Sequence, residues 1–207
     1  MAVASTVILV AVLVVSVVVH EVAHGLVADR LGDSTARMAG RLTLNPLKHI
    51  DPFGSLALPF LGALAGVPFG YAKPVPVRPS RLRSPRRDLV LVAFAGPLSN
   101  LVLGIAGAVV ARGLVPDAPW SFDDLSIAAQ FAYGTALVNL LLAVFNALPV
   151  PPLDGSRLVE YFLPARWLRT WATVHRYGFV VVLALVVSGS LGFVFDPVLD
   201  ALEGFVS

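Results

Sequence analysis

Two histidines one helical turn apart follow directly on a long stretch without charge. Residues 20–24 read His-Glu-Val-Ala-His, the pattern H-E-x-x-H, and no charged residue precedes them. In an α-helix, positions four apart lie about 40° apart around the axis, so both imidazoles can reach one metal ion. Zinc bound in this way lowers the pKa of water to about 7, and an adjacent glutamate can accept the proton. The pattern therefore predicts a hydrolytic zinc site with His20 and His24 as ligands and Glu21 as general base.

A catalytic zinc site of this kind needs a third protein ligand. The chain contains no cysteine, and no glutamate occurs between Glu21 and Glu160. Asp51 is a possible ligand. Asp154 is the better candidate, because it lies in the proline-broken stretch 148–155, and irregular backbone at membrane depth is tolerated where it lines a cavity. His49 and His175 stand beside basic residues, and we expect them at the membrane interface instead.

Two asparagines precede Asp154 on the same predicted helix. Asn139 and Asn146 are seven residues apart and therefore share one helix face. An amide on that face could donate to an oxyanion or hold a substrate backbone, so Asn146 is a candidate catalytic residue. The alternative for Asn146 is a helix cap or an interhelical hydrogen bond. For Asn139 the structural interpretation is favoured.

The elements that carry these residues have the composition of a membrane protein. Hydrophobic residues make up 57% of the 207 residues and charged residues only 14%, against roughly 25% in soluble domains. We expect an all-α polytopic membrane protein forming one membrane-embedded domain over residues 1–207. Four full spans are predicted, at about residues 3–31, 89–111, 127–148 and 171–187.

Two shorter segments complete the predicted fold. Residues 53–69 are apolar but broken by Pro59 and Pro68, with basic residues on both sides, which favours a re-entrant segment. The alternative is five or six spans. Residues 37–44 could form a short strand or hairpin that pairs with an extended substrate. The acidic tail, residues 195–207, is expected at the surface.

The basic residues orient the predicted spans. Residues 29–50, 73–87 and 157–176 are rich in Lys and Arg, whereas the 112–126 loop holds three aspartates and a single arginine. Cytoplasmic loops carry the excess of basic residues, so His20, His24 and Asp154 should lie toward the cytoplasmic side.

Small residues recur every fourth position in the second predicted span. Gly96, Asn100, Gly104 and Ala108 form one stripe, which indicates close helix packing. We expect Asn100 to form a hydrogen bond across that interface.

Three motifs together resemble the site-2 protease family, the intramembrane zinc metalloproteases. They are "HEVAH" at 20–24, "AGPLSN" at 95–100 and "NALPVPPLDG" at 146–155. The likeness is to short bacterial members without PDZ or CBS domains. It implies zinc ligands His20, His24 and Asp154, the base Glu21, and Asn146 near the scissile carbonyl.

The resemblance also implies a function. We expect a zinc-dependent intramembrane endopeptidase that hydrolyses peptide bonds within or near transmembrane segments, in the bacterial cell membrane. Its expected partners are a transmembrane protein substrate and membrane lipid, with no nucleic acid. A metal-binding membrane transporter is the alternative, and a catalytically inactive relative that binds membrane partners is a third interpretation. Transporters usually distribute polar residues over repeated helices near mid-membrane, and the sequence contains no such repeat.

Overall fold

The part of the chain that the structure describes is mainly helical. The computed structural model describes residues 2–49, 73–116 and 120–207, and no strand occurs within these ranges. The predicted re-entrant segment 53–69 and Asp51 lie outside the described residues.

Four helices are long and apolar enough to cross a membrane, as predicted. They are α1 (Val3–Arg30), α4 (Pro85–Arg112), α5 (Ile127–Ala147) and α7 (Leu168–Val187), the last extended by a 3₁₀ turn from Ala165. The shorter helices are α2 (Thr35–Met38), α6 (Ser156–Phe162) and α8 (Gly192–Val206). An α-helix satisfies its own backbone hydrogen bonds, which is why such apolar segments are stable in lipid.

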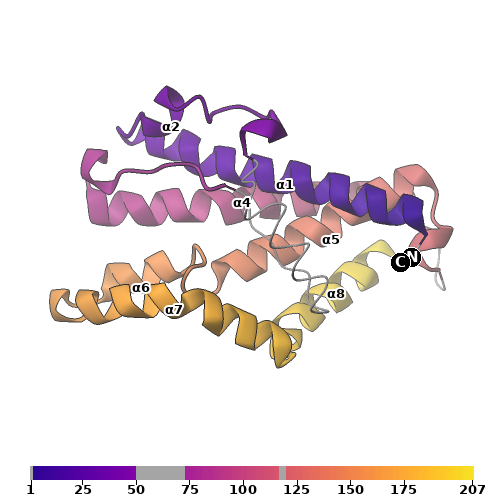
Figure 1. Ribbon diagram of the computed structural model, residues 1–207. Helices are drawn as coiled ribbons and strands as arrows, with labels where there is room; N and C mark the ends of the chain where they lie inside the picture. The colour runs from indigo at the N-terminus through magenta and orange to yellow at the C-terminus, as the bar shows by residue number, and fades with distance from the viewer. Residues whose placement is uncertain (1, 50–72, 117–119) are drawn as a thin grey trace.

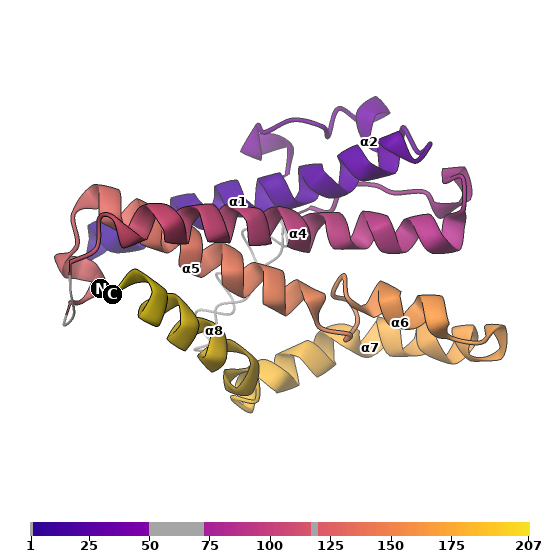
Figure 2. The same ribbon diagram turned by 180° about the vertical axis from the view of Figure 1, so that it is seen from behind.

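Helices α1, α4 and α5 pack side by side and form the centre of the molecule (Figures 1 and 2). Two glycines of α4 make this contact close. Gly104 belongs to the predicted small-residue stripe, and Gly107 does not. A Cβ atom on Gly107 would lie 2.6 Å from the Ala136 backbone nitrogen, and one on Gly104 would lie 2.8 Å from Leu140 Cγ. Small residues at these positions therefore let α4 and α5 approach backbone to backbone, as the sequence predicted.

A glycine motif ends α1 where the predicted span ends. Gly32 has a φ of 112°, in the left-handed region that favours glycine. Its backbone N–H donates to Asp29 O, and that of Asp33 donates to Ala28 O. These two bonds form a Schellman motif, which satisfies helix-end carbonyls and turns the chain back along α1.

The predicted strand at 37–44 is wrong. Thr35–Met38 form the single helical turn α2 instead, because the Asp33 carboxylate accepts hydrogen bonds from both the backbone N–H and the hydroxyl of Thr35. Gly40, with a φ of 64°, follows that turn. Leu42 then packs onto α1 against Gly25, where an added Cβ atom would lie 2.6 Å from Leu42 Cδ2. The apolar spacing of this segment thus reflects packing onto α1 rather than strand pairing.

The C-terminal helices lie on the other side of α5 (Figure 1). Only 11% of the apolar window of α7 is buried, so most of its surface is available to lipid. Helix α8 returns toward the end where both termini lie (Figure 1). Its Leu202 and Val206 are buried in the core with residues of α4 and α5. The acidic tail is therefore an amphipathic helix with one buried face, not wholly a surface segment.

Candidate metal centre

Helix α1 and the loop after α5 bring three candidate ligands together. His20 and His24 are buried on one face of α1, with their Nε2 atoms 3.0 Å apart. Asp154 Oδ2 lies 3.1 Å from His20 Nε2 and 3.4 Å from His24 Nε2. Within the described residues these three form a single group of potential metal ligands, with donor atoms all within 4.8 Å of one another.

The separations fit a tetrahedral zinc ion. Ligand atoms about 2.0–2.2 Å from zinc lie about 3.3 Å from one another in tetrahedral geometry. The three observed separations of 3.0, 3.1 and 3.4 Å bracket this value. The donor set, two imidazoles and one carboxylate, is also one that catalytic zinc sites use, with a fourth position left open.

Hydrogen bonds at the far side of each ring leave both Nε2 atoms free to bind a metal. His24 Nδ1 lies 2.7 Å from Val92 O, a carbonyl that can only accept, so Nδ1 carries the proton. His20 Nδ1 lies 2.5 Å from Asn100 Oδ1. Each Nε2 atom then has a lone pair that faces the Nε2 atom of the other histidine and the carboxylate of Asp154. Three lone-pair donors converging at about 3 Å repel one another unless a cation lies between them, so the arrangement favours a bound metal.

A tight turn after α5 brings Asp154 back to α1. The Gly155 N–H donates to Asn146 O at 2.7 Å, and a Cβ atom on Gly155 would lie 2.5 Å from Leu148 O. Only glycine permits this approach. An ionised carboxylate at this position completes a donor set of two imidazoles and one carboxylate.

Glu21 lines the same cavity as His24 and Asp154. The cavity has a volume of about 270 Å³ and is also lined by Arg157 and by the extended segment 73–78. One oxygen of Glu21, Oε2, accepts a hydrogen bond of 2.7 Å from the Val75 N–H. The carboxylate is thus held at the cavity wall beside the candidate ligands, where a general base would be required.

The other polar residues singled out in the sequence lie in different settings. Asn146 donates to Leu142 O at 3.0 Å, one turn back on its own helix. His49 is buried with its Nε2 3.0 Å from Thr43 O, and His175 packs edge-on against Trp171. None of these three belongs to the ligand group of the described residues.

Two residues near the ligands were not predicted to serve the site. A Cβ atom on Gly96 would lie 2.5 Å from His20 Nε2 and would also collide with His24 Nε2. Gly96 therefore leaves space for an ion, beyond the packing role predicted for it. Val75 supplies the partner of Glu21 from a segment 54 residues later in the chain. Gly96 belongs to the motif AGPLSN at 95–100, but no sequence pattern predicted a role for Val75.

Comparisons with known proteins point to one class of enzyme. The family model of peptidase family M50 matches residues 8–119 and 121–188. The chain is 40% identical to YwhC of Bacillus subtilis, whose name assigns it as a zinc metalloprotease, over 93% of this chain and 86% of the relative. It is 35% identical to Rip2 of Mycolicibacterium smegmatis, named in the same way, over 85% of this chain and 65% of that protein. A zinc metalloprotease of Methanocaldococcus jannaschii, MJ0392, is 25% identical over 75% of this chain and 34% of its own length. No solved structure gives a significant match.

Proposed function

The chain belongs to peptidase family M50 and is a zinc metalloendopeptidase of the membrane, and we propose that it cleaves its protein substrates within or near their transmembrane segments. We propose His20, His24 and Asp154 as the zinc ligands and Glu21 as the general base, in one catalytic domain that extends over the whole chain.

The observation that carries this proposal is that two of the three ligands belong to α1, a helix long and apolar enough to span a membrane. His20 lies about 15 Å from the C-terminal end of α1, given a rise of 1.5 Å per residue. The hydrocarbon core of a bilayer is about 30 Å thick, so a spanning α1 holds its ligands below the membrane surface. Ionisable groups at such depth are costly and usually serve a function. A peptide bond that reaches them must belong to a membrane segment or its immediate flank.

The residues around the ligands have distinct proposed tasks. When bound, zinc supplies the Lewis acidity that activates water and polarises the scissile carbonyl. Glu21 accepts the proton of the attacking water and delivers it to the leaving amine, because its carboxylate is on the same cavity wall as His24. We retain Asn146 as a candidate for contacting the substrate carbonyl, which would require its amide to release Leu142 O.

The substrate must be extended to be cut. A helical peptide bond is shielded by its own hydrogen bonds, so the enzyme must bind an unwound segment. The extended residues 73–78, which line the cavity with Pro74, Val75 and Val77, are the proposed contact for that segment. Residues 37–44 were expected to make this contact, but they do not form the predicted strand.

The charge distribution supports a cytoplasmic orientation in the cell membrane. Of the 15 Lys and Arg residues, only Arg112 belongs to the 112–126 connection. The others belong either to the chain between the last residue of α1 and the first turn of α4, or to the chain between α6 and the first half of α7, which follows the opposite end of α5. By the positive-inside rule, this end and the metal centre face the cytoplasm.

The test compares purified wild-type protein with Glu21→Gln in lipid nanodiscs. We expect one zinc ion per chain in both proteins and loss of cleavage of a model transmembrane substrate in the variant, by about 10²- to 10⁴-fold, the usual contribution of a general base. Asp200→Asn, an exposed carboxylate on α8, is the control and should cleave normally. Zinc transport across vesicles without cleavage, unaffected by Glu21→Gln, would instead support the transporter alternative.

A further inference from the structure

A chain of buried hydrogen bonds links His20 to all three central helices. His20 Nδ1 contacts Asn100 Oδ1 of α4, and Asn100 Nδ2 donates to Asn139 Oδ1 of α5 at 2.7 Å. Asn139 Nδ2 donates to Ser16 Oγ of α1 at 2.8 Å. Asn100 and Asn139 have no exposed surface, and Ser16 is 2% exposed. Polar groups buried this deeply in an apolar bundle are costly unless they are fully paired.

The orientation of the Asn139 amide follows from two backbone carbonyls, and a third, Ser16 O, accepts from Asn100 Nδ2 at 3.4 Å. Thr135 O accepts from Asn139 Nδ2 at 2.9 Å, and Val12 O accepts from the Ser16 hydroxyl at 2.8 Å. Because a carbonyl can only accept, the Asn139 NH₂ group must face Thr135 O and Ser16 Oγ. The Asn139 oxygen must then face Asn100.

The same reasoning extends to the metal ligand. Since Asn139 presents an oxygen, Asn100 must present its NH₂ group to Asn139 and its own oxygen to His20. An oxygen beside His20 Nδ1 requires the proton on Nδ1, which leaves the Nε2 lone pair for the metal. If the Asn100 amide were reversed, its NH₂ group would face Nδ1, and the proton would move to Nε2, where it would block coordination.

We infer that Asn139, through Asn100, is a positioning residue that selects the metal-binding tautomer of His20. His24 needs no such relay, because Val92 O contacts its Nδ1 directly. An asparagine amide has no intrinsic preference between its two orientations, so its neighbours must fix which end faces His20. Asn139 Oδ1, at 2.7 Å from Asn100 Nδ2, is the closer of two acceptors that do so, and Ser16 O at 3.4 Å is the other.

The inference rests on the proposed role of His20 as a zinc ligand, so the experiment begins with His20→Ala. Zinc affinity is measured by chelator competition in nanodiscs, and the visible absorption spectrum is recorded after Co²⁺ substitution. His20→Ala should abolish tight binding. Unchanged affinity in this variant would refute the ligand assignment itself, separately from the relay.

The relay is tested with Asn139→Leu. Loss of an outer-shell partner typically weakens metal affinity about 10- to 100-fold, and we expect that loss together with an altered Co²⁺ spectrum. The matched control is Gln130→Leu, which removes another buried amide of α5 whose Nε2 donates only to Leu125 O. The control should keep wild-type affinity and spectrum. Equal losses in both variants would mean general destabilisation and would overturn the inference.

A second substitution distinguishes tautomer selection from simple packing. Both oxygens of an aspartate accept, so Asp at position 100 needs no partner to orient it. The double variant Asn100→Asp/Asn139→Leu should therefore recover most of the zinc affinity lost in Asn139→Leu. Failure to recover would overturn the relay.

A milder variant keeps the test decisive if Asn139→Leu does not fold. Ser16→Ala removes one of the two acceptors that orient Asn139 and leaves Thr135 O in place. It should weaken zinc affinity in the same direction as Asn139→Leu but by a smaller factor. Wild-type affinity in every folded variant of Asn139 and Ser16 would refute the role.

Discussion

Gly96 lies where α4 passes closest to the two histidines, and its missing side chain leaves room between the ligands. A Cβ atom there would be 2.5 Å from His20 Nε2, a separation that real side chains do not tolerate. We therefore expect Gly96→Ala to weaken zinc binding by at least about tenfold, because the ring positions or the ion must shift. The measurement is the zinc content of the purified variant after dialysis against a weak chelator.

Gly104→Ala is the matched control for this prediction, on the same stripe of α4. Its Cβ atom would lie 2.8 Å from Leu140 Cγ and 3.1 Å from the Leu140 backbone nitrogen, so α4 and α5 would have to move slightly apart. Overpacking of this kind costs about 1–3 kcal/mol of stability, but the metal centre should be unaffected. If Gly104→Ala lost zinc as readily as Gly96→Ala, a general packing effect would explain both results.

The sequence identified the candidate residues, but not all the partners that tertiary contacts give them. The spacing of His20 and His24 predicts that they share a helix face, and their Nε2 atoms are in fact 3.0 Å apart. The predicted hydrogen bond of Asn100 across the helix interface is confirmed, but the sequence did not identify Asn139, 39 positions later, as its partner. A glycine that packs against a helix and a glycine that makes room for an ion also look the same in a sequence.

Segment 73–78 is the element that holds Glu21. The Val75 N–H donates to Glu21 Oε2, and proline at position 75 would remove that donor. Position 75 already precedes a proline, which restricts it to extended backbone, so Val75→Pro should fit the segment. We expect cleavage to fall about tenfold with zinc retained, since a hydrogen bond to a charged group contributes about 1.5–3 kcal/mol.

Val75→Ala is the control for the loss of side-chain packing. It keeps the backbone donor but shortens a buried side chain. Cleavage rates for the two variants and the wild type are measured at equal zinc content. They separate the effect of the lost hydrogen bond from the effect of the lost side-chain packing. A rate in Val75→Pro equal to that in Val75→Ala would show that the hydrogen bond does not orient Glu21.

Asp33 joins the end of α1 to the same segment. Its buried carboxylate accepts from the Thr35 hydroxyl and from the Arg78 backbone N–H, each at 2.5 Å. Burial alone would raise the pKa of Asp33, but these hydrogen bonds and the nearby Arg81 lower it below its usual value. A carboxylate with a depressed pKa stabilises the fold above its unfolded pKa of about 3.9, and this contribution disappears as the pH falls through the folded value.

The prediction is therefore a pH-dependent difference between wild type and Asp33→Asn. The asparagine cannot accept from both donors, so the variant should have a lower thermal midpoint at pH 6. The difference should begin to narrow as the pH falls below about 4, where Asp33 of the unfolded wild-type chain becomes protonated, and should disappear below the lower pKa of the folded state. Thermal unfolding in nanodiscs from pH 3 to pH 7 measures it. A difference that is constant over this range would contradict the assignment.

The long apolar elements were predictable, and two of the shorter segments were not. Four apolar runs predicted the four candidate spans, because a bilayer selects helices by length and composition alone. Residues 37–44 were wrongly assigned to a strand. The conformation of this region depends instead on the hydrogen bond from Thr35 to Asp33 and on the packing of Leu42 on Gly25. Helix α8 was missed for a similar reason. Its buried face is explained only by contact with α4 and α5.

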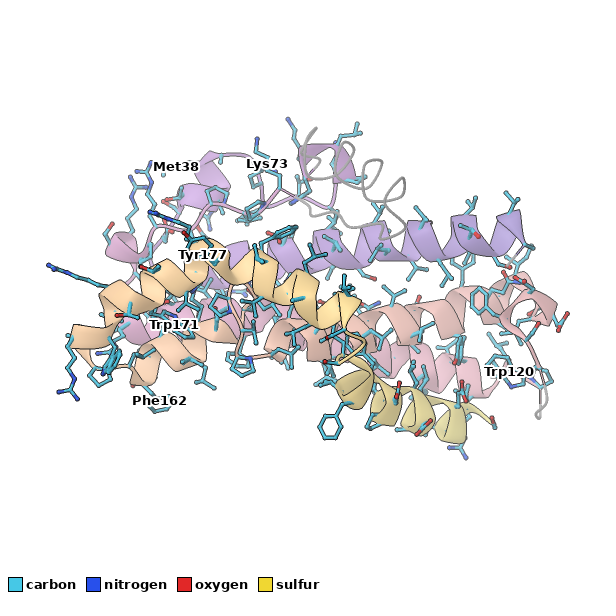
Figure 3. The ribbon with its side chains drawn as sticks, turned by 60° about the horizontal axis from the view of Figure 1, so that its bottom comes forward. Met38, Lys73, Trp120, Phe162, Trp171 and Tyr177 are labelled. Carbon is cyan, nitrogen blue, oxygen red and sulfur yellow. The ribbon has the colours of Figure 1, made fainter. Side chains whose placement is uncertain are left out.

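At the scale of the whole molecule, the two ends differ in charge and both carry aromatic residues. Trp120 lies near one end, whereas Phe162 and Trp171 lie toward the other (Figure 3). Tryptophan is enriched at both membrane–water interfaces, so these residues mark the two headgroup levels. The end with Phe162 and Trp171 also carries the basic residues of the segments that precede α4 and α7.

This asymmetry predicts the orientation of the metal centre, and the absence of cysteine from the sequence makes it measurable. Ser80 and Ser121 are exposed and lie on the segments at opposite ends of α4. In intact bacterial cells, a membrane-impermeant thiol reagent should label Ser121→Cys and leave Ser80→Cys unmodified until the membrane is permeabilised. The reverse pattern would put the basic end, and with it His20, His24 and Asp154, on the outer side. In that case the enzyme would reach its substrates from the cell exterior, contrary to the positive-inside rule.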